Sequence, residues 1–117
     1  MQEMNEIVFK ELKPGVASIS LGENIQGGKE ALDFSSKLFE ISENNYKCVV
    51  INLQNVKMMN SSGLGMLVSA LNTLKKNEIK MVLTNIPDKI DNLLKMTHLN
   101  QVFTSFPTVE EAIKDIE

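Results

Sequence analysis

Two serines and two glycines stand together in the stretch NSSGLG, residues 60–65, where an apolar run gives way to a helical pattern. Asn60 and Ser61 can each accept hydrogen bonds from the free N–H groups of a first helical turn. The same N–H groups, at the positive end of the helix dipole, stabilise a phosphate attached to a serine. The stretch therefore predicts either an ordinary helix cap or a phosphoacceptor site, and the residue types do not choose between Ser61 and Ser62.

Signatures of hydrolases and nucleotide-binding proteins do not fit this stretch. A nucleophile elbow requires G-x-S-x-G, and a P-loop ends in Gly-Lys-Ser/Thr. His98 and Cys48 are the only histidine and cysteine, which disfavours a serine triad or a transition-metal site. We predict no catalytic residues, no metal and no cofactor. The closely spaced amides of Gly63 and Gly65 leave a weak anion nest as the remaining hypothesis for nucleotide binding.

The composition is that of a soluble globular protein, and we expect one domain spanning residues 1–117. Hydrophobic residues make up 43% and charged residues 23% of the chain, and the net charge is −3 without a basic cluster. Direct nucleic-acid binding is therefore disfavoured. No apolar run approaches the about 18 residues that would cross a bilayer, so we expect no membrane insertion. The acidic start MQEMNEIVFK is unlike a signal peptide, which predicts a cytoplasmic protein.

The elements that must position the NSSGLG stretch begin with a predicted hairpin. Two segments with β-branched residues, 6–12 and 15–21, are joined at a Pro-Gly pair that is typical of tight turns. Apolar residues then recur at helical spacing over residues 31–41. The run CVVINL, residues 48–53, is almost entirely apolar and predicts a central strand buried on both faces.

Helices and strands alternate in the second half of the chain. The spacing of apolar residues predicts an amphipathic helix over residues 64–77, a buried strand over 79–85 and a helix with Pro87 in its first turn. A last strand over 101–106 and a short helix over 109–116 follow. This order predicts an α/β fold in which helices pack on a mixed sheet, with the serines in a loop beyond a strand end.

Two long stretches, VVINLQNVKMMNSSGLGMLVSALNTLKK and IKMVLTNIPDKIDNLLKMTHLNQVF, resemble the bacterial anti-sigma-factor antagonists, the single-domain branch of the STAS family. The most specific part of the resemblance is a strand followed by an acidic residue, Ser, Ser/Thr/Ala, Gly, Leu, Gly and an amphipathic helix. The resemblance implies a STAS-like sheet and a partner-switching role without enzymatic activity. An unphosphorylated antagonist of this family binds an anti-sigma factor that is also a serine protein kinase, phosphorylation ends the complex, and a serine phosphatase restores it.

Carried over by position, the resemblance makes Ser61 the phosphoacceptor. The surrounding loop and helix start are then Asn60, Ser62, Gly63, Leu64 and Gly65. The family usually has Asp where this chain has Asn60, and again where it has Ile25.

Expected partner contacts come from the loop after the hairpin and from the methionines near the serines: Glu23, Asn24, Ile25, Met59 and Met66. For at least one of Met58 and Met66 we expect a structural role instead, with Met58 as a strand residue in the core or Met66 on the flank of the helix. The alternative function is a STAS-like scaffold subunit of a transporter or signalling complex, in which Ser61 is only a cap. The sequence leaves the oligomeric state open.

Overall fold

The N-terminal segment forms a hairpin in the computed structural model, which describes residues 7–116. Strand β1 (Val8–Lys13) pairs antiparallel with β2 (Val16–Ser20). Gly15 in the turn has a φ of 85°, a conformation that other residues rarely adopt. The predicted hairpin is confirmed, although residue 6 of its first strand lies outside the described residues. Residues 1–5, on which the cytoplasmic prediction partly depends, and residue 117 also lie outside them.

Five strands form the main sheet in the order β1-β2-β4-β6-β7. β4 (Cys48–Asn52) is the middle strand and pairs parallel with both β2 and β6 (Lys80–Thr84), and β7 (Thr104–Phe106) pairs parallel with β6. Parallel neighbours need long crossover connections, which the helices provide. The predicted mixed sheet, with an N-terminal hairpin followed by alternating helices and strands, is confirmed.

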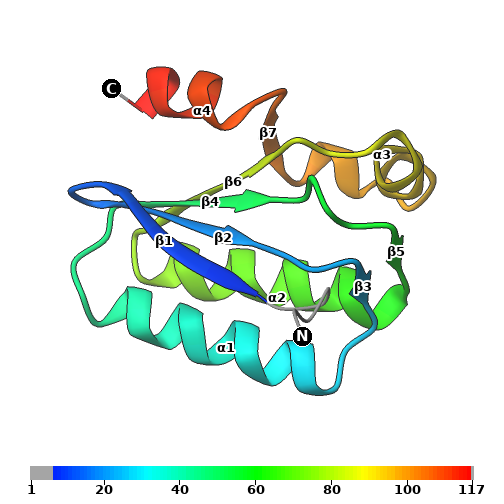
Figure 1. Ribbon diagram of the computed structural model, residues 1–117, viewed down its shortest axis with the longest axis horizontal. Helices are drawn as coiled ribbons and strands as arrows, with labels where there is room; N and C mark the ends of the chain where they lie inside the picture. The colour runs from blue at the N-terminus through cyan, green and yellow to red at the C-terminus, as the bar shows by residue number, and fades with distance from the viewer. Residues whose placement is uncertain (1–6, 117) are drawn as a thin grey trace, which may run out of the picture.

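Helices cover both faces of this sheet (Figure 1). On one face lie α1 (Lys29–Ser42) and α2 (Ser61–Lys76), and on the other lies α4 (Val109–Ile116). Alternate residues of β4 divide between the two layers, because Val49 and Ile51 belong to the core under α1 and α2, whereas Cys48 and Val50 pack with Ala112 of α4. Burial on both faces explains why this strand is apolar without interruption.

The segment between β6 and β7 differs in detail from the prediction. α3 (Asp88–Met96) begins one residue after Pro87, which is its N-cap. A 3-10 turn, η1 (Leu99–Gln101), then occupies the start of the predicted last strand. The strand begins only at Thr104, because the N–H of Val102 donates to the Leu99 carbonyl at 2.9 Å.

A second sheet of two strands lies beside the start of α2, and the sequence did not predict it. β3 (Asn24–Ile25) pairs parallel with β5 (Met58–Met59). Two residues are too few to show the alternation that identifies a strand. Figure 1 shows β3, β5, α3 and the beginning of α2 together at one end of the molecule.

Candidate functional site

Asn60 caps α2. Its backbone is extended, with φ of −100° and ψ of −176°, and its side-chain Oδ1 accepts a hydrogen bond from the N–H of Gly63 at 2.9 Å. The Asn60 carbonyl oxygen accepts from the N–H of Leu64 at 3.0 Å. Of the two capping candidates in the sequence, Asn60 is therefore the cap, and Ser61 is the first helical residue.

Asn60 also ties α2 to the segment that follows the hairpin. Its backbone N–H donates to the carbonyl oxygen of Ile25 at 3.2 Å. Its side-chain Nδ2 donates to the carbonyl oxygen of Gln26 at 3.4 Å. An aspartate has no side-chain N–H and could not make this second bond. The side-chain amide of Asn60 thus connects two segments that are far apart in the sequence.

Gly63 permits a close approach between α2 and the small sheet. A Cβ at this position would clash with the carbonyl oxygen of Ile25 and stand 2.9 Å from Cγ of Met59. Only glycine therefore allows the first turn of α2 to lie against both β3 and β5. This packing fixes where the two serines stand.

Ser61 and Ser62 are both exposed, and their hydroxyls face different surroundings. Ser61 borders a groove on the outer side of α2 that reaches Leu99. Ser62 borders a separate groove between α1 and α2, and a Cβ on Gly27 would stand 3.2 Å from the Ser62 Cβ. Within residues 7–116, the backbone N–H groups of the two serines have no hydrogen-bond partner. These free donors can hold an anion carried by a serine hydroxyl.

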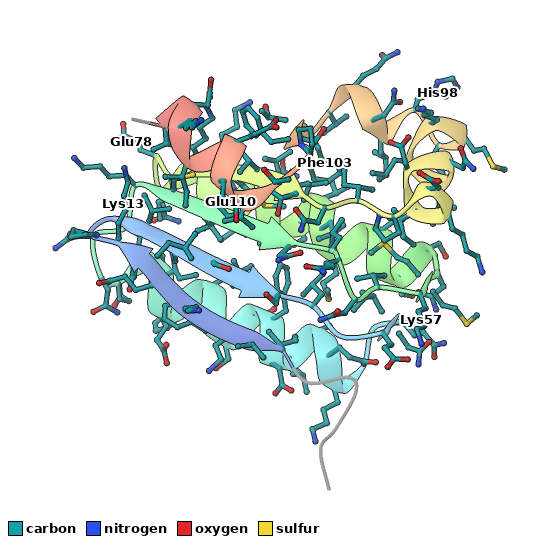
Figure 2. The ribbon with its side chains drawn as sticks, turned by 45° about the horizontal axis from the view of Figure 1, so that its top comes forward. Lys13, Lys57, Glu78, His98, Phe103 and Glu110 are labelled. Carbon is teal, nitrogen blue, oxygen red and sulfur yellow. The ribbon has the colours of Figure 1, made fainter. Side chains whose placement is uncertain are left out.

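An ion pair flanks the small sheet. Nζ of Lys57 lies 3.2 Å from Oε1 of Glu23, whose side chain is only 19% exposed. The Glu23 carbonyl oxygen also accepts from the N–H groups of Lys57 and Met58, at 2.8 and 3.0 Å. Figure 2 shows Lys57 at the end of the molecule opposite Lys13 of the hairpin. Glu23 thus holds β5 in place, and its side chain already has a partner.

Two of the expected partner contacts are corrected by the structure. The side chains of Ile25 and Met66 are 0% and 9% exposed and belong to the core. Ile25 therefore presents no surface to a partner, and Met66 presents only a small one, at the groove between α1 and α2. The expected structural roles of two methionines were wrong, because Met58, expected in the core, is exposed, and Met66, expected on a helix flank, lies in the core. Asn24 is exposed, and Met59 is half-buried against the core.

Two methionines outside the expected partner contacts are exposed. Met58 is 51% exposed and Met96 of α3 is 78% exposed. Between α3 and β5 lies a pocket of about 290 Å³, lined by Met59, Met96 and Leu93 among others. No local sequence pattern reveals this pocket, because the pocket depends on how α3 packs beside β5.

Neither a metal centre nor a membrane span is found in the part of the chain that the structure describes. Residues 7–116 contain no group of three or more His, Cys, Asp or Glu side chains placed to hold a metal ion. Over the same range, every helix is too short or too polar to cross a membrane.

Comparisons with known proteins agree with this architecture. Anti-sigma-B factor antagonists of Staphylococcus aureus are 33% identical over 54 residues, or 46% of this chain and 50% of theirs. The match thus spans half the length of these curated relatives.

Solved structures share the fold at low sequence identity. The anti-sigma factor antagonist SpoIIAA in its unphosphorylated form gives a TM-score of 0.79 at 16% identity, over 95% of this chain and 96% of that one. Its phosphorylated form, described as a Bacillus cell fate determinant, gives a TM-score of 0.75 at 16% identity, over 96% of this chain and 100% of that one. A sulfate transporter family protein from Wolinella succinogenes gives a TM-score of 0.71 at 13% identity, over 88% of this chain and 85% of that one. These likenesses concern the fold alone.

The sequence family is identified by a separate match. The model of the STAS domain matches residues 10–112, which include the small sheet, the capped start of α2 and all of the main sheet except the first two residues of β1. The chain belongs to the STAS domain family.

Proposed function

We propose that this protein is a non-enzymatic binding module regulated by phosphorylation, an anti-sigma-factor antagonist that sequesters an anti-sigma factor with serine kinase activity while Ser61 is unphosphorylated. The observation that carries the proposal is the exposed Ser61 hydroxyl at the first helical position of α2, beside free N–H groups. The names of the Staphylococcus aureus relatives and the two forms of SpoIIAA support this reading. In this proposed function, residues 1–117 form one cytoplasmic domain.

Ser61 is the better acceptor of the two serines. Its groove opens on the outer side of α2, where a kinase can reach it. Ser62 faces the Gly27 backbone, which stands close enough for an added Cβ there to touch Ser62. A phosphate on Ser62 would have to share this space with the loop that leads into α1.

The phosphate is compatible with the fold of this chain. The Ser61 Oγ would form a bond to the γ-phosphorus of ATP, ADP would leave, and the hydroxyl proton would pass to a base on the kinase. The product carries about −1.5 to −2 charges at neutral pH. Free N–H groups and the positive end of the helix dipole stabilise that charge. A serine phosphatase would restore the hydroxyl by hydrolysis.

Loss of the complex follows from what surrounds Ser61. β5 and α3 lie at the same end of the molecule as the start of α2 (Figure 1). On them, the exposed Met58 and Met96 and the half-buried Met59 offer a partner an apolar contact. A partner that covers this surface must remove water from Ser61 as well. Removing water from a phosphate is far more costly than removing it from a hydroxyl. Phosphorylation therefore weakens binding without requiring a change of fold.

A pull-down from extracts of the source cells tests the proposal, with wild-type, Ser61→Asp and Ser62→Asp proteins as baits and intact-mass analysis of the native protein. We expect a kinase-like partner on the wild type and on Ser62→Asp, little on Ser61→Asp, and one phosphate on Ser61. Equal capture by all three baits, with no phosphate on the native protein, would make this chain a static scaffold. Since Asp carries less charge than phosphate, the mass measurement is the decisive half of the test.

A further inference from the structure

Gly65 lies on the exposed surface of α2, one turn after Ser61. Its backbone is helical and is not among the positive-φ glycines, and outside its chain neighbours and the backbone of its own helix no atom stands within 4 Å of where a Cβ would be. Glycine in a helix interior destabilises the helix relative to alanine. Within residues 7–116, no packing contact and no backbone conformation requires the missing side chain.

At Gly63, two residues earlier, packing within this chain does require glycine. A Cβ on Gly63 would clash with the carbonyl oxygen of Ile25. The absence of a side chain therefore has a different physical explanation at each of the two glycines. Gly63 allows another segment of this chain, β3, to pack against α2, whereas Gly65 leaves open space on the exposed surface of α2.

Ser61 and Gly65 border the same shallow groove, which has a volume of about 610 Å³. Leu99 of η1 borders it from beyond α2, and Lys76 borders it from the last turn of α2. Among residues 7–116, Lys76 is the only charged residue that borders the groove.

We propose that Gly65 makes room for the main chain of the kinase that phosphorylates Ser61 and is therefore a specificity-determining residue for that reaction. The inference rests on the proposed function. Phosphoryl transfer requires the Ser61 Oγ and the γ-phosphorus of ATP to come within about 3–3.5 Å. The bond to phosphorus then forms, the bond to ADP breaks, and the proton passes to the kinase. The kinase segment that holds this geometry must lie over the surface that Ser61 shares with Gly65, where a side chain would obstruct it.

The test uses the full chain with Gly65→Ala or Gly65→Leu, and Ser36→Leu as a matched control that adds the same side chain to an exposed position of α1. Extract of the source cells supplies the kinase, and ATP labelled in the γ-phosphoryl group supplies the phosphate. Initial rates are measured against the concentration of each variant. Thermal unfolding of each purified variant is measured in parallel.

We expect Gly65→Ala to raise the melting temperature and to raise the KM for phosphorylation about tenfold, the effect of a modest steric clash. Gly65→Leu should raise the KM further, and Ser36→Leu should leave it at the wild-type value. A wild-type KM in both Gly65 variants would overturn the inference and leave the proposed function intact. A rise in KM accompanied by a lower melting temperature would also overturn it. No phosphate on the wild type itself would refute the proposed function, and this inference with it.

Discussion

Gly63 of α2 lies so close to Ile25 of β3 that a Cβ on Gly63 would clash with the Ile25 carbonyl oxygen. The same carbonyl oxygen accepts a hydrogen bond from the N–H of Asn60 at 3.2 Å. The hydrogen bond holds the start of α2 against β3, and glycine at position 63 permits the close approach. The position of Ser61 depends on a segment far away in the sequence.

Gly63→Ala should destabilise the protein by about 1–3 kcal/mol, the usual cost of forcing an extra carbon into a packed site. The matched control is Gly65→Ala, where the space is open and the better helix propensity of alanine should add about 1 kcal/mol. Urea unfolding of both variants measures the difference. Equal stabilisation by the two substitutions would show that α2 does not approach β3 as described.

Asn60→Ala should lower the free energy of unfolding by about 1 kcal/mol, because the N–H of Gly63 loses its acceptor. Asn72→Ala makes the same change at an exposed position inside α2, where it should be neutral or slightly stabilising. A lower melting temperature for Asn60→Ala together with an unchanged or higher one for Asn72→Ala would identify Asn60 as the cap. Similar effects at both positions would argue against it.

Met58 and Met66 should respond differently to alanine. Met66 belongs to the core, so Met66→Ala should cost about 2–5 kcal/mol. Met58 is half exposed, and Met58→Ala should change stability by no more than about 0.5 kcal/mol. Under the proposed function, Met58→Ala should nevertheless weaken partner binding. Calorimetric titration measures this, and unchanged affinity would remove Met58 from the interface.

The stability of the protein should fall between pH 9 and about 11 because of Cys48. Burial raises the pKa of its thiol from 9.0 to about 11, although the Lys80 ammonium opposes the rise. In that interval the folded protein keeps a proton that the unfolded chain releases, so unfolding becomes more favourable by up to about 1.4 kcal/mol per pH unit. Unfolding of wild type and Cys48→Ala across this range isolates the effect. The same pH dependence in both proteins would contradict it.

The sequence predicted the main sheet well because its signals are local. The uninterrupted apolar run of β4 is enough to predict a strand buried on both faces, and the apolar stripe of α2 is enough to predict a helix on the sheet. The start of α2 is visible too, since Asn is a strong cap. These features require no knowledge of distant contacts.

The surroundings of Ser61 were less predictable because they depend on distant contacts. Ile25 follows a polar loop, and its complete burial results from pairing with β5 and from the close approach of Gly63. The exposure of Met58 likewise depends on which side of a two-residue strand faces the core. Sequence periodicity cannot report either fact over so few residues.

The most direct test of the account is the affinity of one purified partner for two forms of this protein, unphosphorylated and carrying one phosphate on Ser61. The partner is the kinase recovered with the unphosphorylated wild type, and calorimetric titration gives both dissociation constants. We expect the phosphate to weaken binding at least about tenfold, equivalent to about 1.4 kcal/mol, while the melting temperature of the free protein is unchanged or higher. Equal affinity of the two forms would contradict the switch and leave Ser61 as the first residue of a capped helix.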